Sequence, residues 1–135
     1  MKQDDKNLLL KDLCARLPYN IKCTYYDKCV DEEDEGTITG MQNGTYFVID
    51  GGCIDVENIK PYLFPLESIT IEQKEELSKL GVSYCEYALH DDTRGLGIMI
   101  DEAYIFYEFC YKHHIDFLDL IEKGLAIDAT GLNIY

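Results

Sequence analysis

The first apolar residues of the chain recur at helical spacing and predict a helix over residues 4–17. Asp4 or Asp5 is placed to cap its N-terminus, because a short carboxylate accepts a bond from a free backbone N–H. Pro18 ends it, since proline disfavours the helical conformation of the preceding residue. The apolar stripe that faces a core consists of Leu9, Leu10, Leu13, Cys14 and Leu17.

After residue 20 the apolar pattern changes to alternation, which is typical of half-buried strands. Ile21, Cys23 and Tyr25 alternate with more polar residues and predict the first strand. Residues 37–42 and 45–50 flank Asn43-Gly44, a dipeptide that suits a tight type I′ hairpin turn. These residues predict an antiparallel β-hairpin.

The remaining β-rich segment is divided by acidic and glycine residues. Asp31 to Glu35 is an unbroken acidic run, and repulsion between like charges predicts a solvated loop. Gly51-Gly52 ends the second arm of the hairpin, and residues 53–56 predict a further short strand. Residues 55–59 are equally compatible with a single helical turn before Pro61.

The order strand, acidic loop, hairpin, short turn and final strand resembles small SH3-like or Tudor-like barrels. This resemblance covers about 40 residues and is one of pattern alone. We therefore expect an α+β fold with an N-terminal helix, then a small antiparallel sheet over residues 20–64 that resembles an SH3-like barrel, with its closure left open by the sequence. A mostly helical part is expected over residues 66–135.

Two helices are signalled clearly in that second part. Thr70 and Gln73 match a capping box, and Gly81 fits the position after a helix end. Asp101 is placed to cap a second helix that runs to about His113. Residues 82–89 suit either a strand or a helix, and residues 90–97 read as a polar loop. Asp116 is expected to cap a last helix over residues 117–123, and the apolar tail after it is expected to pack on the domain.

Four phrases of this chain are similar to an uncharacterised protein family of gut anaerobic bacteria and their phages and mobile elements. They are LKDLCARLPY at 10–19, IKPYLFPL at 59–66, HHID at 113–116 and LIEKGLAI at 120–127. The family has no assigned activity. The resemblance implies an intracellular accessory protein of phage or mobile-element origin, and it assigns no site residue.

Length and charge narrow the classes of function. The 135 residues suit one domain, and both halves contribute to a net charge of −14. Such a chain lacks the clustered lysines and arginines that hold phosphates, which disfavours direct binding of nucleic acid or anionic membranes. The N-terminus has no apolar signal region and no segment is apolar enough to span a bilayer, so a cytoplasmic location is expected. The six cysteines contain no C-x-x-C pair and are expected to be buried, reduced and apolar in character.

The weak candidates for metal binding or nucleophilic chemistry are Cys110 and His114. Four residues apart, they would share one face of the predicted helix, a spacing that can chelate a metal. A third ligand would have to come from His90, another cysteine or a carboxylate. The alternative is that Cys110 packs in the core and the histidines mark the helix C-terminus. The second alternative is favoured, so no catalytic, cofactor or metal residue is predicted.

Eleven tyrosines without a tryptophan are unusual in a chain of this length. They cannot all bury their hydroxyls cheaply, so many are expected at the edge of the core. Tyrosine is also enriched in protein interfaces. The acidic run lacks the calcium-ligand spacing of an EF-hand, and Gly95-Leu96-Gly97 lacks the pattern of a phosphate loop.

These observations leave three hypotheses. The favoured one is a non-enzymatic protein-interaction module whose partner is a second copy or another protein. The alternative is an acidic decoy that mimics nucleic acid and occupies a basic host protein. A metal-dependent or Cys–His enzyme ranks last.

Overall fold

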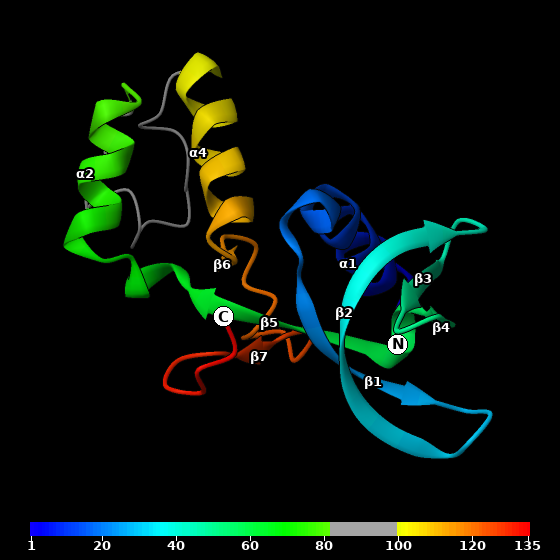
Figure 1. The fold of residues 1–135 in the computed structure, drawn as a ribbon. Coiled ribbons are helices and arrows are strands. Elements are labelled where there is room, and N and C mark those ends of the chain that lie inside the picture. Colours follow the sequence, from blue (N-terminus) through cyan, green and yellow to red (C-terminus); the bar gives the residue numbers. More distant parts are fainter. Residues whose placement is uncertain (82–99) are drawn as a thin grey trace.

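The computed structural model describes residues 1–81 and 100–135 and shows a mixed α+β fold (Figure 1). The alternatives for residues 82–89 and the loop expected at 90–97 lie outside the described residues. The helices are α1 (Gln3–Arg16), α2 (Ile71–Lys79) and α4 (Ile100–Lys112). The strands are β1 (Lys22–Asp27), β2 (Glu32–Gln42), β3 (Tyr46–Ile49), β4 (Gly52–Asp55), β5 (Ile59–Pro65), β6 (Ile115–Asp116) and β7 (Ile127–Asp128).

The strands form one open sheet in the order β4-β3-β2-β1-β5-β6, and β7 also pairs with β5. β1 pairs antiparallel with both β2 and β5, and a 3₁₀ turn precedes β5. The SH3-like barrel suggested for residues 20–64 is not observed: the sheet does not close, because β4 and β6 at its two edges do not pair with each other in the described residues. β5 instead continues outward, where the short strands β6 and β7 pair with it in parallel.

The acidic run is not the loop that charge repulsion predicted. Residues 32–35 form the first part of β2, and Tyr25 of β1 pairs with Asp34. All four side chains remain exposed to water, which weakens their mutual repulsion. The backbone hydrogen bonds to β1 outweigh that repulsion, so like charges alone did not decide the local structure.

The hairpin at Asn43-Gly44 is confirmed. Asn43 and Gly44 have the positive φ angles expected there, 54° and 81°, but Gln42 pairs with Tyr46, so the loop has three residues instead of the two of a type I′ turn. A second glycine matters for another reason. A Cβ on Gly36 would lie 2.5 Å from an Asp50 carboxylate oxygen and 2.6 Å from Ile49 Cγ2, so glycine lets β2 pass close to the end of β3.

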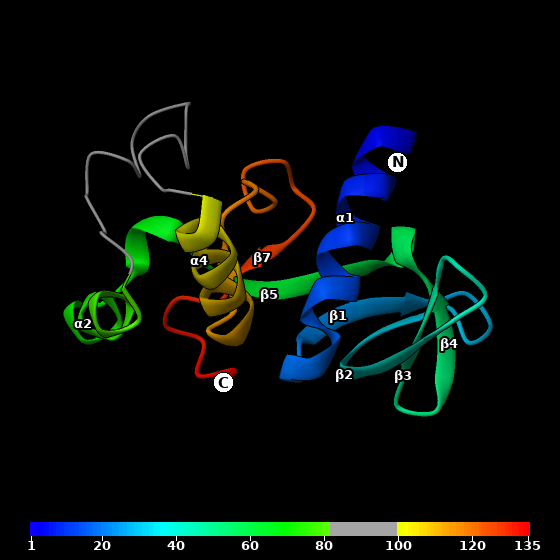
Figure 2. The same cartoon turned by 90° about the horizontal axis from the view of Figure 1, so that it is seen from above.

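The buried residues form two clusters, one that includes residues of β5 and one that begins just after it. Figure 2 shows the elements around them, with α1 beside the sheet and α2 and α4 together beyond the other end of β5. The larger lies between α1 and the sheet, with Leu9, Leu13 and Phe47 fully buried. The smaller lies among α2, α4 and the 3₁₀ turn that follows β5, with Leu77 and Phe109 at its centre. β5 spans both parts, as the two views show, so the sheet and the helical pair share one strand.

Helix α1 differs from its prediction at both ends. Lys2 occupies the N-cap position without a side-chain hydrogen bond, and Asp4 and Asp5 lie inside the first turn. At these positions their negative charges interact favourably with the helix dipole, but their side chains do not cap the helix. The helix ends at Arg16, and Pro18 lies in a 3₁₀ turn over Leu17–Tyr19, where its fixed φ is tolerated.

The capping box that begins α2 is confirmed, with bonds of 3.1 Å from Gln73 N–H to Thr70 Oγ1 and 3.0 Å from Thr70 N–H to Gln73 Oε1. Gly81 has a φ of 90° directly after that helix, as expected. α4 begins at Ile100, so Asp101 lies inside the helix and does not precede it.

The last helix, which was expected over residues 117–123, is absent from this described part of the chain. Residues 117–124 form turns between β6 and β7, and the tail packs against β5, which confirms its expected burial. Among the described residues, no helix combines the length and apolar character needed to cross a membrane. Cys23 and Cys110 are buried as expected, whereas Cys29 and Cys53 are exposed.

Candidate functional site

Cys110 and His114 do not share a helix face. α4 ends at Lys112, and His114 adopts a left-handed conformation with φ of 59°, so the spacing of an ideal helix no longer applies. Burial raises the pKa of the Cys110 thiol to about 12, which keeps it protonated near neutral pH and unreactive as a nucleophile. Within residues 1–81 and 100–135, no three histidine, cysteine or acidic side chains gather as metal ligands would.

His114 belongs instead to the packing of the C-terminal tail. Its ring stacks on Tyr135 at 3.6 Å between centroids and 10° between planes. Nδ1 is buried without a hydrogen-bond partner among the described residues. Burial, with the nearby Arg16 charge, lowers the pKa of His114 from 6.5 to about 4. The imidazole is therefore neutral in the folded protein at ordinary pH.

This burial makes a prediction for acid stability. Between about pH 6.5 and pH 4 the unfolded chain binds a proton at His114 and the folded chain does not, so the free energy of unfolding falls as the pH falls. In His114→Asn this part of the pH dependence is expected to vanish, and asparagine tolerates the left-handed conformation. Urea unfolding at several pH values in this window measures it. An unchanged slope in the variant would contradict the assignment.

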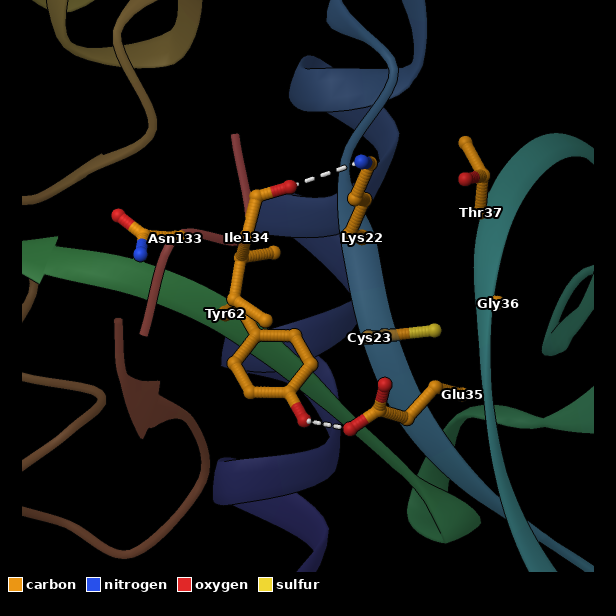
Figure 3. A pocket seen from close by; sticks show the side chains of 8 residues that line it. All are labelled: Lys22, Cys23, Glu35, Gly36, Thr37, Tyr62, Asn133 and Ile134. Atoms are coloured by element: carbon orange, nitrogen blue, oxygen red, sulfur yellow. Dashed lines mark hydrogen bonds between the residues drawn. The ribbon is translucent and has the colours of Figure 1, made fainter. Parts of the chain in front are cut away.

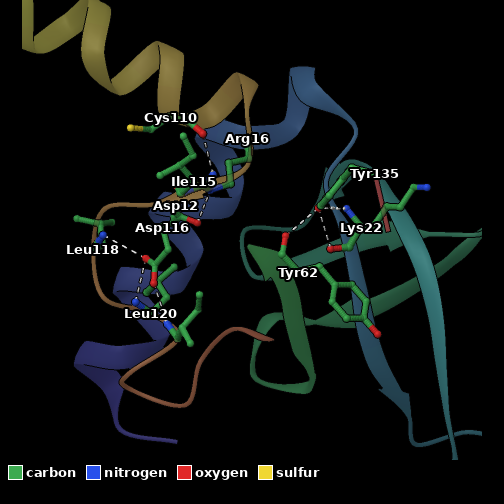
Figure 4. A network of polar contacts seen from close by, with 11 residues as sticks. Asp12, Arg16, Lys22, Tyr62, Cys110, Ile115, Asp116, Leu118, Leu120 and Tyr135 are labelled. Atoms are coloured by element: carbon green, nitrogen blue, oxygen red, sulfur yellow. Dashed lines mark hydrogen bonds and ion pairs between the residues drawn. The ribbon is translucent and has the colours of Figure 1, made fainter. Parts of the chain in front are cut away.

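A buried ion pair within α1 lies against the end of α4 (Figure 4). Arg16 Nε donates to Asp12 Oδ2 at 2.7 Å, and both side chains are fully buried. Arg16 also donates to the backbone oxygens of Ile115 at 2.7 Å and Cys110 at 3.4 Å. The guanidinium thus ties together segments that lie almost a hundred residues apart in the chain. Its charge is neutralised locally by Asp12.

Asp116 organises the turn after β6. Its carboxylate accepts bonds from the backbone N–H groups of Leu118, Leu120 and Ile121, at 3.2, 3.0 and 2.9 Å (Figure 4). The sequence correctly indicated a capping role for Asp116, but the capped segment is a series of turns. This turn brings Phe117 against α4, where it contacts Tyr107 and Tyr111.

A polar notch of about 290 Å³ lies between β1, β2, β5 and the C-terminal tail (Figure 3). Its polar groups are largely paired with each other. Tyr62 donates its hydroxyl to Glu35 at 2.6 Å, and the Lys22 ammonium donates to the Ile134 oxygen at 2.8 Å. The hydroxyl of Tyr135 bridges the strands beside the notch, accepting from the Lys22 N–H and donating to the Tyr62 oxygen. These bonds give the notch a structural role.

A larger groove of about 340 Å³ separates the end of α1 from α4. One wall is a stripe on α4 at positions i, i+3, i+4 and i+7, which share a helix face. The other wall comes from the end of α1 and the 3₁₀ turn after it. The residues that line the groove are Ala15, Pro18, Tyr19, Tyr104, Tyr107, Glu108 and Tyr111. We call this feature the tyrosine groove.

The rings of the tyrosine groove differ in exposure, and two of them pack against Phe117. Tyr104 is 72% exposed and Tyr107 is 38% exposed. Tyr107 stacks on Phe117 at 4.9 Å, and Tyr111 lies edge-on to the same ring at 5.4 Å. The Arg16 guanidinium lies 5.3 Å from the Tyr111 centroid. The buried Arg16 therefore supports one wall of the groove through the Tyr111 ring.

The tyrosine groove also carries hydroxyl groups. Among residues 1–81 and 100–135, Tyr19, Tyr104, Tyr107 and Tyr111 form no hydrogen bond through their hydroxyl groups. Burial raises the pKa of the Tyr111 hydroxyl, so this group stays protonated and able to donate at neutral pH.

Comparison with family models, curated proteins and solved structures finds no match to this chain. The tyrosine groove was not identified from the sequence, which indicated only that tyrosines were abundant. The spacing of Tyr104, Tyr107 and Tyr111 was a usable signal for one wall. The second wall had no signal, because it is brought there by contacts between distant parts of the chain.

Proposed function

We propose that this protein is a non-enzymatic protein-interaction module and that the tyrosine groove is its binding site. The observation that carries the proposal is the row of Tyr104, Tyr107 and Tyr111 facing Tyr19 and Pro18 across an open groove. Large aromatic rings that are exposed together supply most of the binding energy in many interfaces. Phe117 contacts Tyr107 and Tyr111, which lowers the entropic cost of binding because these two rings need little ordering.

The groove suits a protein segment better than a compact small molecule. Small-molecule sites are concave and bury most of their ligand, with a few convergent polar groups. Here Tyr104 projects into water and the lining contains a single charged residue, Glu108, among the described residues. An extended chain can contact such a row of rings along its length.

Replacing Tyr104 and Tyr107 together with alanine is expected to reduce retention of the partner in a pull-down from native lysate by at least tenfold. Loss of aromatic anchors commonly costs about 2 kcal/mol or more per interface hot spot. Tyr46→Ala is the matched control, because Tyr46 is a similarly exposed tyrosine (42%) on β3 and does not line the groove. Circular dichroism of each variant verifies that the fold is kept.

Light scattering decides whether the partner is a second copy or another protein. A monodisperse monomer that retains no protein would contradict the interaction module. Equal retention by the double variant and by Tyr46→Ala would place the interface elsewhere than in the groove.

An acidic decoy of nucleic acid is a second candidate, and one observation favours it. Because residues 32–35 lie in β2, their side chains alternate between two faces, and the backbone positions of Glu33 and Glu35 on one of them are about 7 Å apart along the strand. Such a row resembles spaced phosphates. In the same pull-down, this candidate requires retention that depends on Glu33 and Glu35 and is lost in high salt.

A further inference from the structure

We propose that the tyrosine groove binds a proline-containing segment in the polyproline II conformation, flanked by basic residues. This inference rests on the proposed function and names the chemistry of its partner. Aromatic-lined grooves recognise this conformation because it is preformed and loses little entropy on binding.

The spacing of the rings matches the repeat of such a segment. Along α4, Tyr104 and Tyr111 are seven residues apart, which is about 10.5 Å at 1.5 Å per residue. Polyproline II has three residues per turn and advances about 9.3 Å per turn. Two prolines separated by one turn therefore meet the two outer rings, and Tyr107 lies between them. Rings in a row fit a linear segment, whereas a single cationic group would require rings around one point.

The polar groups of the groove complement the backbone of that segment. Polyproline II forms no internal hydrogen bonds, so its carbonyl oxygens are free to accept. The exposed tyrosine rings carry hydroxyl donors that form no bond within the described residues. Recognition through stacking and donated hydroxyls requires no base, acid or metal in the groove.

The negative charge of the groove and of the whole protein favours basic residues on either side of the prolines in the bound segment. Glu108 is the charged residue in the described lining, and Arg16 below Tyr111 is already neutralised by Asp12. The protein as a whole carries a net charge of −14, which attracts basic partners and repels acidic ones. A second copy of this chain is a poor occupant for the same reason. In addition, no two of its three prolines, at 18, 61 and 65, are three residues apart.

The test uses a synthetic peptide in which two prolines lie three residues apart and arginines flank them. One matched peptide replaces both prolines with alanine, and another replaces the arginines with glutamate. Titration followed by NMR of ¹³C-labelled tyrosine rings reports both affinity and location. The expected result is a shift of the Tyr19, Tyr104, Tyr107 and Tyr111 signals, with binding at least tenfold weaker for either matched peptide. Tyr104→Ala with Tyr107→Ala should weaken the parent peptide by a similar factor, while Tyr46→Ala leaves its affinity unchanged.

Three results would overturn the inference. They are no binding of the parent peptide, equal binding of the peptide without prolines, and shifts confined to tyrosines outside the groove such as Tyr25 or Tyr46. If the peptide fails but the pull-down still depends on Tyr104 and Tyr107, the occupant is of another chemistry and the interaction module stands. If both fail, the groove is not a binding site.

Discussion

Replacing Arg16 with methionine is expected to lower the free energy of unfolding by about 3–5 kcal/mol. The substitution leaves the Asp12 carboxylate buried without its counter-charge, and the Asp12 Oδ1 atom already lacks a partner in the described residues. It also removes the donor to the backbone oxygen of Ile115, the first residue of β6. Urea unfolding followed by far-ultraviolet circular dichroism measures the loss.

Two controls make this result specific. Lys6→Met removes partly exposed ion pairs to Asp55 and Glu57 and should cost less than about 1 kcal/mol. The double variant Asp12→Leu with Arg16→Met replaces the pair with apolar side chains and should recover much of the loss. If Arg16→Met alone lowered the free energy of unfolding by less than about 1 kcal/mol, Arg16 would not stabilise the contact between α1 and the segment at the end of α4.

Replacing Phe47 with alanine is expected to cost about 3–5 kcal/mol, because it removes a fully buried ring from the cluster under α1. The neighbouring Tyr46 supplies the control, since alternation on β3 turns its ring outward to water. Tyr46→Ala should cost no more than about 1 kcal/mol. Comparable losses for the two variants would contradict the packing of β3.

The same variant tests the expectation that residues 1–135 form one domain. Hydrogen exchange of backbone amides reports local stability in each part. If the sheet unfolds as one unit with α2 and α4, amides of α4 around Phe109 should lose as much protection from exchange as those of β5 around Leu63. Unchanged protection in α4 would divide the chain into two units.

Predictions from the sequence were correct where interactions between neighbouring residues determine the local conformation. The turn at Asn43-Gly44 needs positive φ angles that these two residues adopt at little cost. The capping box of Thr70 and Gln73 closes within four residues. The role of Asp116 was also foreseen, because a carboxylate readily accepts from the backbone directly after it.

Local rules failed where a distant segment supplied the deciding contact. Repulsion predicted a loop for the acidic run, but β1 offered hydrogen bonds that made residues 32–35 a strand. Helical spacing placed Cys110 and His114 on one face. In the structure α4 ends at Lys112, two residues before His114, and His114 stacks on Tyr135.

By itself, the sequence determined the acidity of this protein, its mixed α+β class, its hairpin and the abundance of tyrosine, because each depends on composition or on short-range conformational energy. The tertiary structure alone decided that the sheet is open and that Arg16 is a buried link. It also decided that Tyr19, which follows α1, lines the same groove as Tyr104, Tyr107 and Tyr111 of α4. These features depend on burial and on contacts between residues about a hundred positions apart, which no local pattern encodes.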